Sequence, residues 1–394
     1  MKILCPSCWM PDVWNRMALV IFLWFVTVCG HPVIPALDYS GRLDSAVTAL
    51  MTRYEAVGLS VAVVKSNRIF YHHSWGVRDK EKMIPLQDDD VFRLFSISKS
   101  FISTAIMQLV EQKRLALDDD IRRYLPWVNR NPRFPDIPIT IEMLLCHRSS
   151  INDSQGYLSD FDMLRPERNM SYGQCYNQER PGSAYYYSNV NYNLLGAVIE
   201  KVTQMRFDEY IIANILHPLG LHGFYDMSQM GKRHFAQAYQ YSTPKQGYQR
   251  NASAYAPLSK ELSSYVLGET TPLLSPCGGL KLNAAELAEY MMMHMNKGKL
   301  RGHRIVKKKS ERQMWKVRST ESNYGLALIH YYDIIDGEEL IGHRGAGYGI
   351  NTSMFFNPKK KYGFVILCNG VNTSLIDHYP FHRTLVRILY ENII

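Results

Sequence analysis

The segment Phe95-Ser96-Ile97-Ser98-Lys99 opens a stretch of chain that is predicted to form a helix over residues 96–112. Ser96 and Lys99 stand three positions apart, so their side chains share one side of the first helical turn. A serine hydroxyl needs a base to become a nucleophile, a lysine of lowered pKa is such a base, and a helix start favours developing negative charge. An ordinary helix start with an exposed lysine has the same pattern, so the interpretation needs partners elsewhere. The inward face of this helix consists of Ile102, Ala105, Ile106 and Leu109.

A second polar cluster, Tyr185-Tyr-Tyr-Ser-Asn189, directly precedes a predicted helix over residues 192–202. Beside a lysine ammonium, a tyrosine in this cluster could act as a phenolate base, and an asparagine amide could hold the lysine or a substrate carbonyl. An aromatic turn with an asparagine cap explains the cluster equally well when it is taken alone.

A third cluster, His343-Arg344-Gly345-Ala346-Gly347, lies at the end of a predicted strand. Glycines at this point allow the backbone to approach a ligand closely. An exposed amide of this strand could join the Ser96 amide as a pair of oxyanion donors, and His343 could contact substrate or change charge with pH. Alternatively, His343 is an ordinary histidine at the end of a strand, before a turn, and has no functional role.

The two ends of the chain are rich in predicted strands, whereas the middle is mainly helical. We expect an α/β fold in which strands from both chain ends form one antiparallel sheet flanked by terminal helices, with the helical middle inserted and a cleft between the two parts. The predicted strands cover residues 59–65, 69–75, 324–332, 338–343, 351–356 and 362–368. Further predicted helices cover residues 43–56, 141–146, 207–215, 284–295 and 375–394.

Residues 1–30 contain an uninterrupted apolar run, Met17–Cys29, after Lys2 and Arg16. The run is shorter than the about 20 residues that a membrane-spanning helix needs, so we expect a signal peptide and keep a membrane anchor as the alternative. Residues 31–394 are then the folded domain that contains the three clusters, with the helical insertion at about 110–310. The expected location is secreted, periplasmic or membrane-associated on the non-cytoplasmic side.

Composition limits the classes of partner. The formal net charge is +9, which we expect to be spread over the whole chain rather than gathered in one basic run. The chain has no zinc-finger spacing and no RNA-binding aromatic motif, so no nucleic-acid partner is expected. Cys5 and Cys8 have metal-ligand spacing but no second pair follows, so no metal is expected.

The three clusters, in this order, resemble the serine β-lactamase and penicillin-binding-protein superfamily, nearest its branch of class C β-lactamases, carboxypeptidases and esterases. The resemblance runs from about residue 43 to the end of the chain. The segments that carry it are Val91–Lys99, Leu117–Asp120, Ile141–Ser149, Tyr187–Asn189, Pro218–Leu221 and Ser275–Gly279.

The resemblance implies a role for each residue that matches a family motif. Ser96 would be the acylated nucleophile, Lys99 its proton-accepting partner and Tyr187 the general base. Asn189 would bind the lysine or the substrate, and His343, Gly345 and Ala346 would line the substrate site. The backbone amides of Ser96 and Ala346 would form the oxyanion hole of a two-step hydrolysis that needs no cofactor.

Two departures from the family pattern narrow the expected function. Class C β-lactamases have Lys-Thr-Gly where this chain has His343-Arg344-Gly345, and esterases, peptidases and mitochondrial β-lactamase-like proteins of the superfamily often have histidine there. That difference argues against efficient destruction of antibiotics. Many relatives have His-Thr-Ser-Gly where this chain has His147-Arg148-Ser149-Ser150, so a position usually held by glycine is filled.

We therefore expect a serine hydrolase acting through an acyl-enzyme on an ester, a small amide or a peptide. D-alanyl-D-alanine carboxypeptidase or weak β-lactamase activity is a close alternative. A noncatalytic or self-assembling scaffold of the same fold is the alternative from another class. The oligomeric state is left open, and membrane association is expected only through the N-terminal segment.

Overall fold

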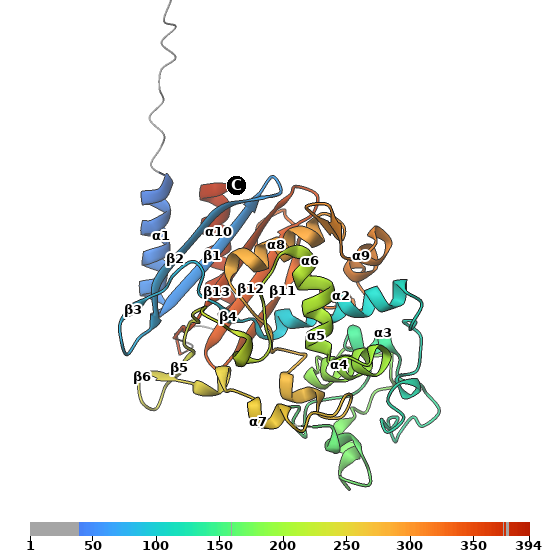
Figure 1. Ribbon diagram of the computed structural model, residues 1–394. Coiled ribbons are helices and arrows are strands. Elements are labelled where there is room, and N and C mark those ends of the chain that lie inside the picture. The colour runs from blue at the N-terminus through green and yellow to red at the C-terminus, as the bar shows by residue number, and fades with distance from the viewer. Residues whose placement is uncertain (1–38, 159, 373, 376–377) are drawn as a thin grey trace, which may run out of the picture. The chain divides into compact units, whose positions relative to one another are not determined.

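A seven-stranded antiparallel sheet joins the two ends of the chain, as the sequence predicts (Figure 1). The computed structural model describes residues 39–158, 160–372, 374–375 and 378–394, of which residues 40 onward form one compact unit. The predicted leader, residues 1–30, lies outside the described residues. The strand order is β10 (Ile329–Tyr331), β11 (Leu340–Gly347), β12 (Ile350–Asn357), β13 (Tyr362–Cys368), β1 (Gly58–Lys65), β2 (Arg68–Asp79) and β3 (Ile84–Pro85).

The central strands alternate their side chains between two apolar cores. On one face, Val61 and Val63 pack with α1 (Tyr39–Arg53) and α10 (His378–Ile393), the helices at the two ends of the fold. On the other face, Ala62 and Val64 belong to the core that contains α2 (Ser98–Glu111) and α8 (Ala284–Met295). Helix α2, which follows directly after Ser96, therefore lies between the sheet and the rest of the helical region.

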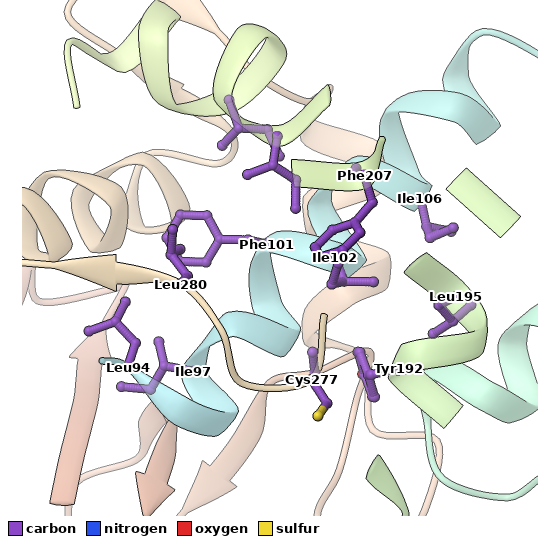
Figure 2. Packing of buried hydrophobic residues seen from close by; sticks show 14 of the residues in the cluster. Leu94, Ile97, Phe101, Ile102, Ile106, Tyr192, Leu195, Phe207, Cys277 and Leu280 are labelled. Carbon is purple, nitrogen blue, oxygen red and sulfur yellow. The ribbon is translucent and has the colours of Figure 1, made fainter. Parts of the chain in front are cut away.

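The helical region is built around α2, whose residues are buried along most of its length. Figure 2 shows Phe101, Ile102 and Ile106 of α2 among Tyr192, Leu195, Phe207 and Leu280, which come from three other segments. The other helices are α3 (Ile141–Leu145), α4 (Asn189–Thr203), α5 (Phe207–Ile211), α6 (His217–Leu219), α7 (Ser259–Leu262) and α9 (Lys308–Trp315). Three two-stranded pairs complete the fold: β4 (Phe92–Arg93) with β7 (Lys281–Leu282), β5 (Tyr239–Ser242) with β6 (Gly247–Arg250), and β8 (Lys299–Leu300) with β9 (His303–Arg304).

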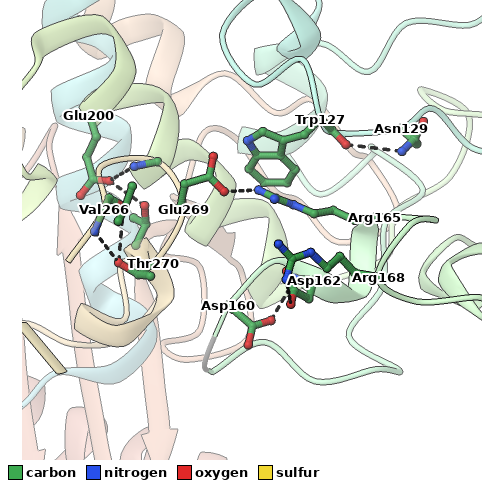
Figure 3. A network of polar contacts seen from close by, with 12 residues as sticks. Trp127, Asn129, Asp160, Asp162, Arg165, Arg168, Glu200, Val266, Glu269 and Thr270 are labelled. Atoms are coloured by element: carbon green, nitrogen blue, oxygen red, sulfur yellow. Dashed lines mark hydrogen bonds and ion pairs between the residues drawn. The ribbon is translucent and has the colours of Figure 1, made fainter. Parts of the chain in front are cut away.

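A polar network fixes the loops on the far side of α4 (Figure 3). The buried carboxylate of Glu200 in α4 accepts hydrogen bonds from the amides of Phe207 and Gly268 and from the hydroxyls of Tyr265 and Thr271, at 2.6–3.2 Å. Arg165 pairs with Glu269 and stacks on Trp127 at 4.4 Å. This network holds the loop that leads into residues 275–279 of the candidate site.

Several predicted boundaries differ from the structure. The predicted strand 324–332 contains only β10 (Ile329–Tyr331), because the chain turns at Ala327, which has φ of +64°. The predicted helix 207–215 is α5 followed by a π-helical turn over Ile212–Leu216. The strand predicted to end at residue 343 continues as β11 to Gly347, so the third cluster lies inside the strand and not after it.

Two further features concern domain organisation. α8 lies within the range predicted for the inserted helical region, but it packs directly on β1, β12 and β13. Among the residues that the structure describes, no helix has the length and apolar character needed to cross a membrane. Within the same part of the chain, no group of three or more His, Cys, Asp or Glu side chains is placed to hold a metal ion.

Candidate active site

Lys99 lies at the centre of the candidate site and is fully buried. Ser96 ends up beside it because a 3₁₀ turn, η1 (Phe95–Ile97), leads directly into α2. The Lys99 ammonium donates to Ser96 Oγ at 3.1 Å, to Asn189 Oδ1 at 2.8 Å and to the carbonyl of Cys277 at 3.0 Å. Three neutral acceptors thus hold the lysine against the serine hydroxyl.

Burial lowers the pKa of Lys99 from its usual value near 10.5 to about 8. The negative charges of Cys277, when ionised, and Asp153 act in the opposite direction but are weaker than the desolvation. No carboxylate contacts the lysine directly within the part of the chain that the structure describes. A lysine with such a pKa is partly neutral at mildly alkaline pH and can accept the proton of the serine.

Tyr187 lies over the same lysine, with the Lys99 nitrogen 4.9 Å from the centre of its ring. Its side chain is 40% exposed, toward the cavity described below, and its hydroxyl is a hydrogen-bonding neighbour of Ser96. Burial nevertheless raises the pKa of Tyr187 well above its usual value, and the hydrogen bond with Ser96 only partly opposes this. Tyr187 is therefore a neutral phenol at neutral pH, whereas Lys99 has the pKa expected of a base.

Asn189 owes its orientation to Asp153, a residue that the sequence analysis did not single out. The Asp153 carboxylate accepts from the backbone amide and the side-chain amide of Asn189, both at 2.9 Å. It also accepts from Ser188 Oγ at 2.7 Å and from the amide of Val190 at 3.1 Å, which satisfies the start of α4. With its side-chain nitrogen bound to Asp153, Asn189 must present its oxygen to Lys99.

His147 holds the backbone on both sides of Tyr187. Its carbonyl accepts from the amide of Tyr186 at 2.8 Å, and its Nδ1 accepts from the amide of Ser188 at 3.1 Å. The ring lies against Tyr187, with centroids 4.3 Å apart. His147 is fully buried, and burial together with the Lys99 charge lowers its pKa well below the usual value, so Nδ1 remains an acceptor.

The third cluster reaches the nucleophile through the close approach of β11 to η1. A side chain at Gly345 would place its first carbon 2.2 Å from the Leu94 carbonyl and 2.9 Å from the Ser96 amide nitrogen, so only glycine fits. Thr352 of β12 fastens the contact by donating to the Leu94 carbonyl at 2.8 Å. Ala346, the second predicted oxyanion donor, is the next residue of the same strand.

His343, a residue of the same strand, is buried. Burial and the nearby Lys99 charge lower the pKa of His343 to about 3. Its Nε2 lies 3.1 Å from the hydroxyl of Tyr324, and its Nδ1 lies 2.6 Å from the carbonyl of Arg344. Of the two roles considered for His343, contact with a substrate fits this lowered pKa better than a change of charge near neutral pH.

A cavity of about 370 Å³ lies beside β11, where this strand continues past its pairing with β10. Its polar and aromatic walls come from the second and third clusters and from β10, β12 and α10. Residues that line it include Tyr185, Tyr187, Tyr331, His343, Arg344 and Ala346. A larger groove of about 710 Å³ lies between α1 and the β5–β6 hairpin and contains none of the predicted site residues. The cavity at β11, by contrast, is lined by Tyr187, His343 and Ala346 of the predicted site.

The structure brings Ser96, Lys99, Tyr187 and Asn189 together, and β11 carries His343, Gly345 and Ala346 to the same place. Sequence reasoning missed Asp153 and the Cys277 carbonyl and gave His147 no role in the site. Asp153 follows an asparagine in a polar loop. Nothing in the neighbouring sequence indicates that its carboxylate binds Asn189. The positive φ of His147, +58°, is equally invisible in one sequence.

Comparison with known proteins agrees with the resemblance of the motifs. The model of a family described as Beta-lactamase matches residues 43–384. Protein flp of Staphylococcus aureus (strain N315) is 23% identical over 372 residues, which cover 90% of this chain and 70% of that protein. D-aminopeptidase of Gluconobacter oxydans (strain 621H) is 29% identical over 196 residues, 47% of this chain and 35% of that enzyme.

Solved structures share the fold over almost the same span. The octameric penicillin-binding protein homologue from Pyrococcus abyssi superposes with a TM-score of 0.71 at 25% identity and covers 89% of this chain and 77% of its own. D-amino acid amidase from Ochrobactrum anthropi SV3 has a TM-score of 0.69 at 20% identity, covering 90% of this chain and 99% of its own. At that identity the amidase supports the fold alone.

Proposed function

We propose, from the premise that the chain belongs to the Beta-lactamase family and is a serine hydrolase, that it cleaves a small amide or ester through an acyl-enzyme on Ser96. One observation supports the proposal most strongly. A fully buried lysine whose pKa is about 8 donates to the serine at 3.1 Å and is held there by neutral acceptors. An exposed lysine at an ordinary helix start would have neither property.

In the proposed acylation step, neutral Lys99 accepts the Ser96 proton as Ser96 Oγ attacks the substrate carbonyl carbon. The carbonyl oxygen becomes negative and is stabilised by the backbone amides of Ser96 and Ala346. The approach of β11 to η1 at Gly345 supports this assignment, because it brings the strand carrying Ala346 against the Ser96 backbone. The start of the helix adds a favourable field for the developing charge.

Collapse of the tetrahedral intermediate breaks the bond to the amine or alcohol, which must leave with a proton. Tyr187 is the proposed carrier: its neutral hydroxyl gives a proton to the leaving group and regains one from the Lys99 ammonium. Ser96 beside its hydroxyl and the Lys99 nitrogen 4.9 Å from the centre of its ring support this relay. Water then attacks the ester of Ser96 with the same groups acting in reverse, which frees the acid and restores the serine.

For Tyr187 the proposal modifies the role that the family resemblance implies. A phenolate base would require a lowered pKa, whereas the pKa of Tyr187 is raised. Lys99 is therefore the proposed base of acylation, and Tyr187 passes protons between Lys99 and the substrate.

The proposed substrate class is a small amide or short peptide, and an amide of a D-amino acid is the first candidate. The name of one similar protein, a D-aminopeptidase, supports this choice. The cavity of about 370 Å³ fits a side chain and its amide rather than a folded protein. Esters of the same size are the second class, since they need the same steps with a better leaving group.

The proposal is tested by the intact mass of the full chain after exposure to a fluorophosphonate, for wild type and Ser96→Ala. One adduct on the wild type and none on Ser96→Ala is expected. Hydrolysis is then compared for D- and L-phenylalanine amide, a p-nitrophenyl ester, a D-Ala-D-Ala peptide and benzylpenicillin. A stable penicilloyl adduct with peptide turnover would replace the amidase proposal with a carboxypeptidase. Absence of any adduct on the folded wild type would contradict the acyl-enzyme and favour a noncatalytic scaffold.

A further inference from the structure

The positive charge of the chain is concentrated in one segment, and the expectation that it is spread over the whole length is wrong. Of the 45 Lys and Arg residues and 36 Asp and Glu residues, residues 297–318 hold ten and one, which leaves 35 of each sign elsewhere. The single acid, Glu311, is fully buried against His294 at 2.6 Å. The formal net charge of +9 therefore belongs to this segment.

Six of these cations form an exposed surface that we call the basic surface. Its members lie on the β8–β9 hairpin and at the start of α9: Lys299, Arg304, Lys307, Lys308, Lys309 and Arg312. Within the described ranges, none of the six is within ion-pair distance of a carboxylate, whereas Arg301 in the same hairpin pairs with Glu289. Unpaired cations at this density repel one another, and a negatively charged partner would relieve that repulsion.

The basic surface lies near one end of the seven-stranded sheet. Asn296, just before the hairpin, bonds to Asn67 in the β1–β2 turn at 2.5 Å, and a groove lined by Arg68 and Lys299 runs between the two. The last residues of α10 lie at this end too, because Lys65 donates to the Ile393 carbonyl at 2.6 Å. α1 runs antiparallel to β1 across a short connection, so α1 also begins at this end (Figure 1).

The place where α1 begins matters because the apolar run Met17–Cys29 precedes it in the chain. The sequence predicts that this run is a signal peptide or an anchor, so it is expected to meet a membrane. A run that stayed in a membrane would hold the rest of the chain, and with it the basic surface, close to a bilayer.

From this placement we propose that the basic surface binds the surface of an anionic phospholipid bilayer. Lysine-rich patches are attracted to such bilayers by their charge alone. No exposed large apolar side chain lies in residues 297–318. The surface therefore has no large apolar side chain that could insert into a bilayer and no exposed large aromatic ring on which nucleic-acid bases could stack. Six exposed cations can each meet a phosphate of a continuous lipid surface, whereas a single small anion would neutralise only some of them.

The experiment measures co-sedimentation of the full chain with vesicles of pure phosphatidylcholine and with vesicles that also contain phosphatidylglycerol. The apolar leader would bind both kinds of vesicle, so the difference between them isolates the electrostatic contribution. The first variant is Lys307→Glu, Lys308→Glu, Lys309→Glu. The control variant, Lys232→Glu, Lys245→Glu, Lys260→Glu, makes the same change of net charge at exposed lysines outside the segment.

The wild type and the control variant are expected to bind the anionic vesicles at least tenfold more tightly than the neutral ones. The first variant is expected to lose most of that preference, and circular dichroism checks that it is folded. Equal loss in both variants would overturn the proposal, because net charge alone would then explain binding. So would tighter binding of the wild type to RNA or duplex DNA than to the anionic vesicles at the same salt. None of these results depends on turnover by Ser96.

Discussion

At the scale of single residues, the pKa of Lys99 sets the pH range in which the proposed chemistry works. Only neutral Lys99 accepts the Ser96 proton, and its pKa is about 8. The rate of fluorophosphonate labelling is therefore expected to rise about tenfold per pH unit below 8 and to level off above it. Labelling by mass spectrometry at a series of pH values measures this without a known substrate. A flat profile below pH 8 would show that another group is the base.

A second prediction at this scale concerns His147 as a positioning residue for Tyr187. His147→Asn keeps an acceptor near the place of Nδ1 and tolerates the positive φ of +58°, whereas His147→Leu leaves the Ser188 amide without its partner. Labelling of Ser96 should fall less than about tenfold in His147→Asn and about a hundredfold in His147→Leu, since small displacements of catalytic groups cost that much.

Both His147 variants are to be compared at equal fractions of folded protein, measured by circular dichroism. The pH profile separates positioning from a general loss of stability. In His147→Asn it should keep the Lys99 midpoint near pH 8, because Lys99 keeps its own contacts. Equal labelling rates in the two folded variants would remove His147 from this role.

The sequence predicted those site residues whose spacing in the chain is itself informative. Ser96 and Lys99 are neighbours on one helical turn, and Tyr187 and Asn189 belong to one short motif, so few alternatives had to be excluded. Asp153 meets Asn189 across 36 positions, and the Cys277 carbonyl meets Lys99 across 178. Such contacts depend on how loops fold over α2 and α4. Local sequence patterns do not predict this folding.

At the scale of elements, α4 links the site to the loops of the helical region through Glu200. Four donors bind its buried carboxylate, and all four would be left unsatisfied in Glu200→Ala. We expect the free energy of unfolding to fall by about 3 kcal/mol or more, measured by urea denaturation. Glu209→Ala, at a half-exposed position on α5, is the control and should change stability by less than about 0.5 kcal/mol. Similar losses in both would contradict the proposed importance of the network.

Elements whose pattern was regular were predicted well, and irregular ones were not. The predicted helix 284–295 agrees with α8, which begins with a capping box at Asn283 and Glu286. β11 was predicted too short, because its continuation through Gly345 is stabilised by contact with η1 and by pairing with β12. Ser150, where relatives have glycine, adopts φ of +66°, and its hydroxyl accepts from Asn131 at 3.1 Å. That hydrogen bond offsets part of the strain.

At the scale of the whole molecule, the sheet was predictable because both chain ends contain strand-length runs rich in apolar residues. The sequence did not indicate that α8, from the middle of the chain, would cover one face of that sheet. This packing joins the sheet and the helical region into one core, with α2 between them. The parts on the two sides of the site therefore depend on each other for stability.

The last prediction follows from this shared core. Leu385→Ala removes a fully buried side chain from α10, on the face of the sheet opposite the site, and should lower the free energy of unfolding by about 3 kcal/mol. Because the sheet supports β11 and α2, loss of Ser96 labelling and loss of circular dichroism should move together to the same lower urea concentration. The control Glu391→Ala, exposed on the same helix, should leave both midpoints unchanged. A shift of the circular dichroism alone, with labelling retained at the wild-type midpoint, would mean that the site region unfolds independently of the sheet.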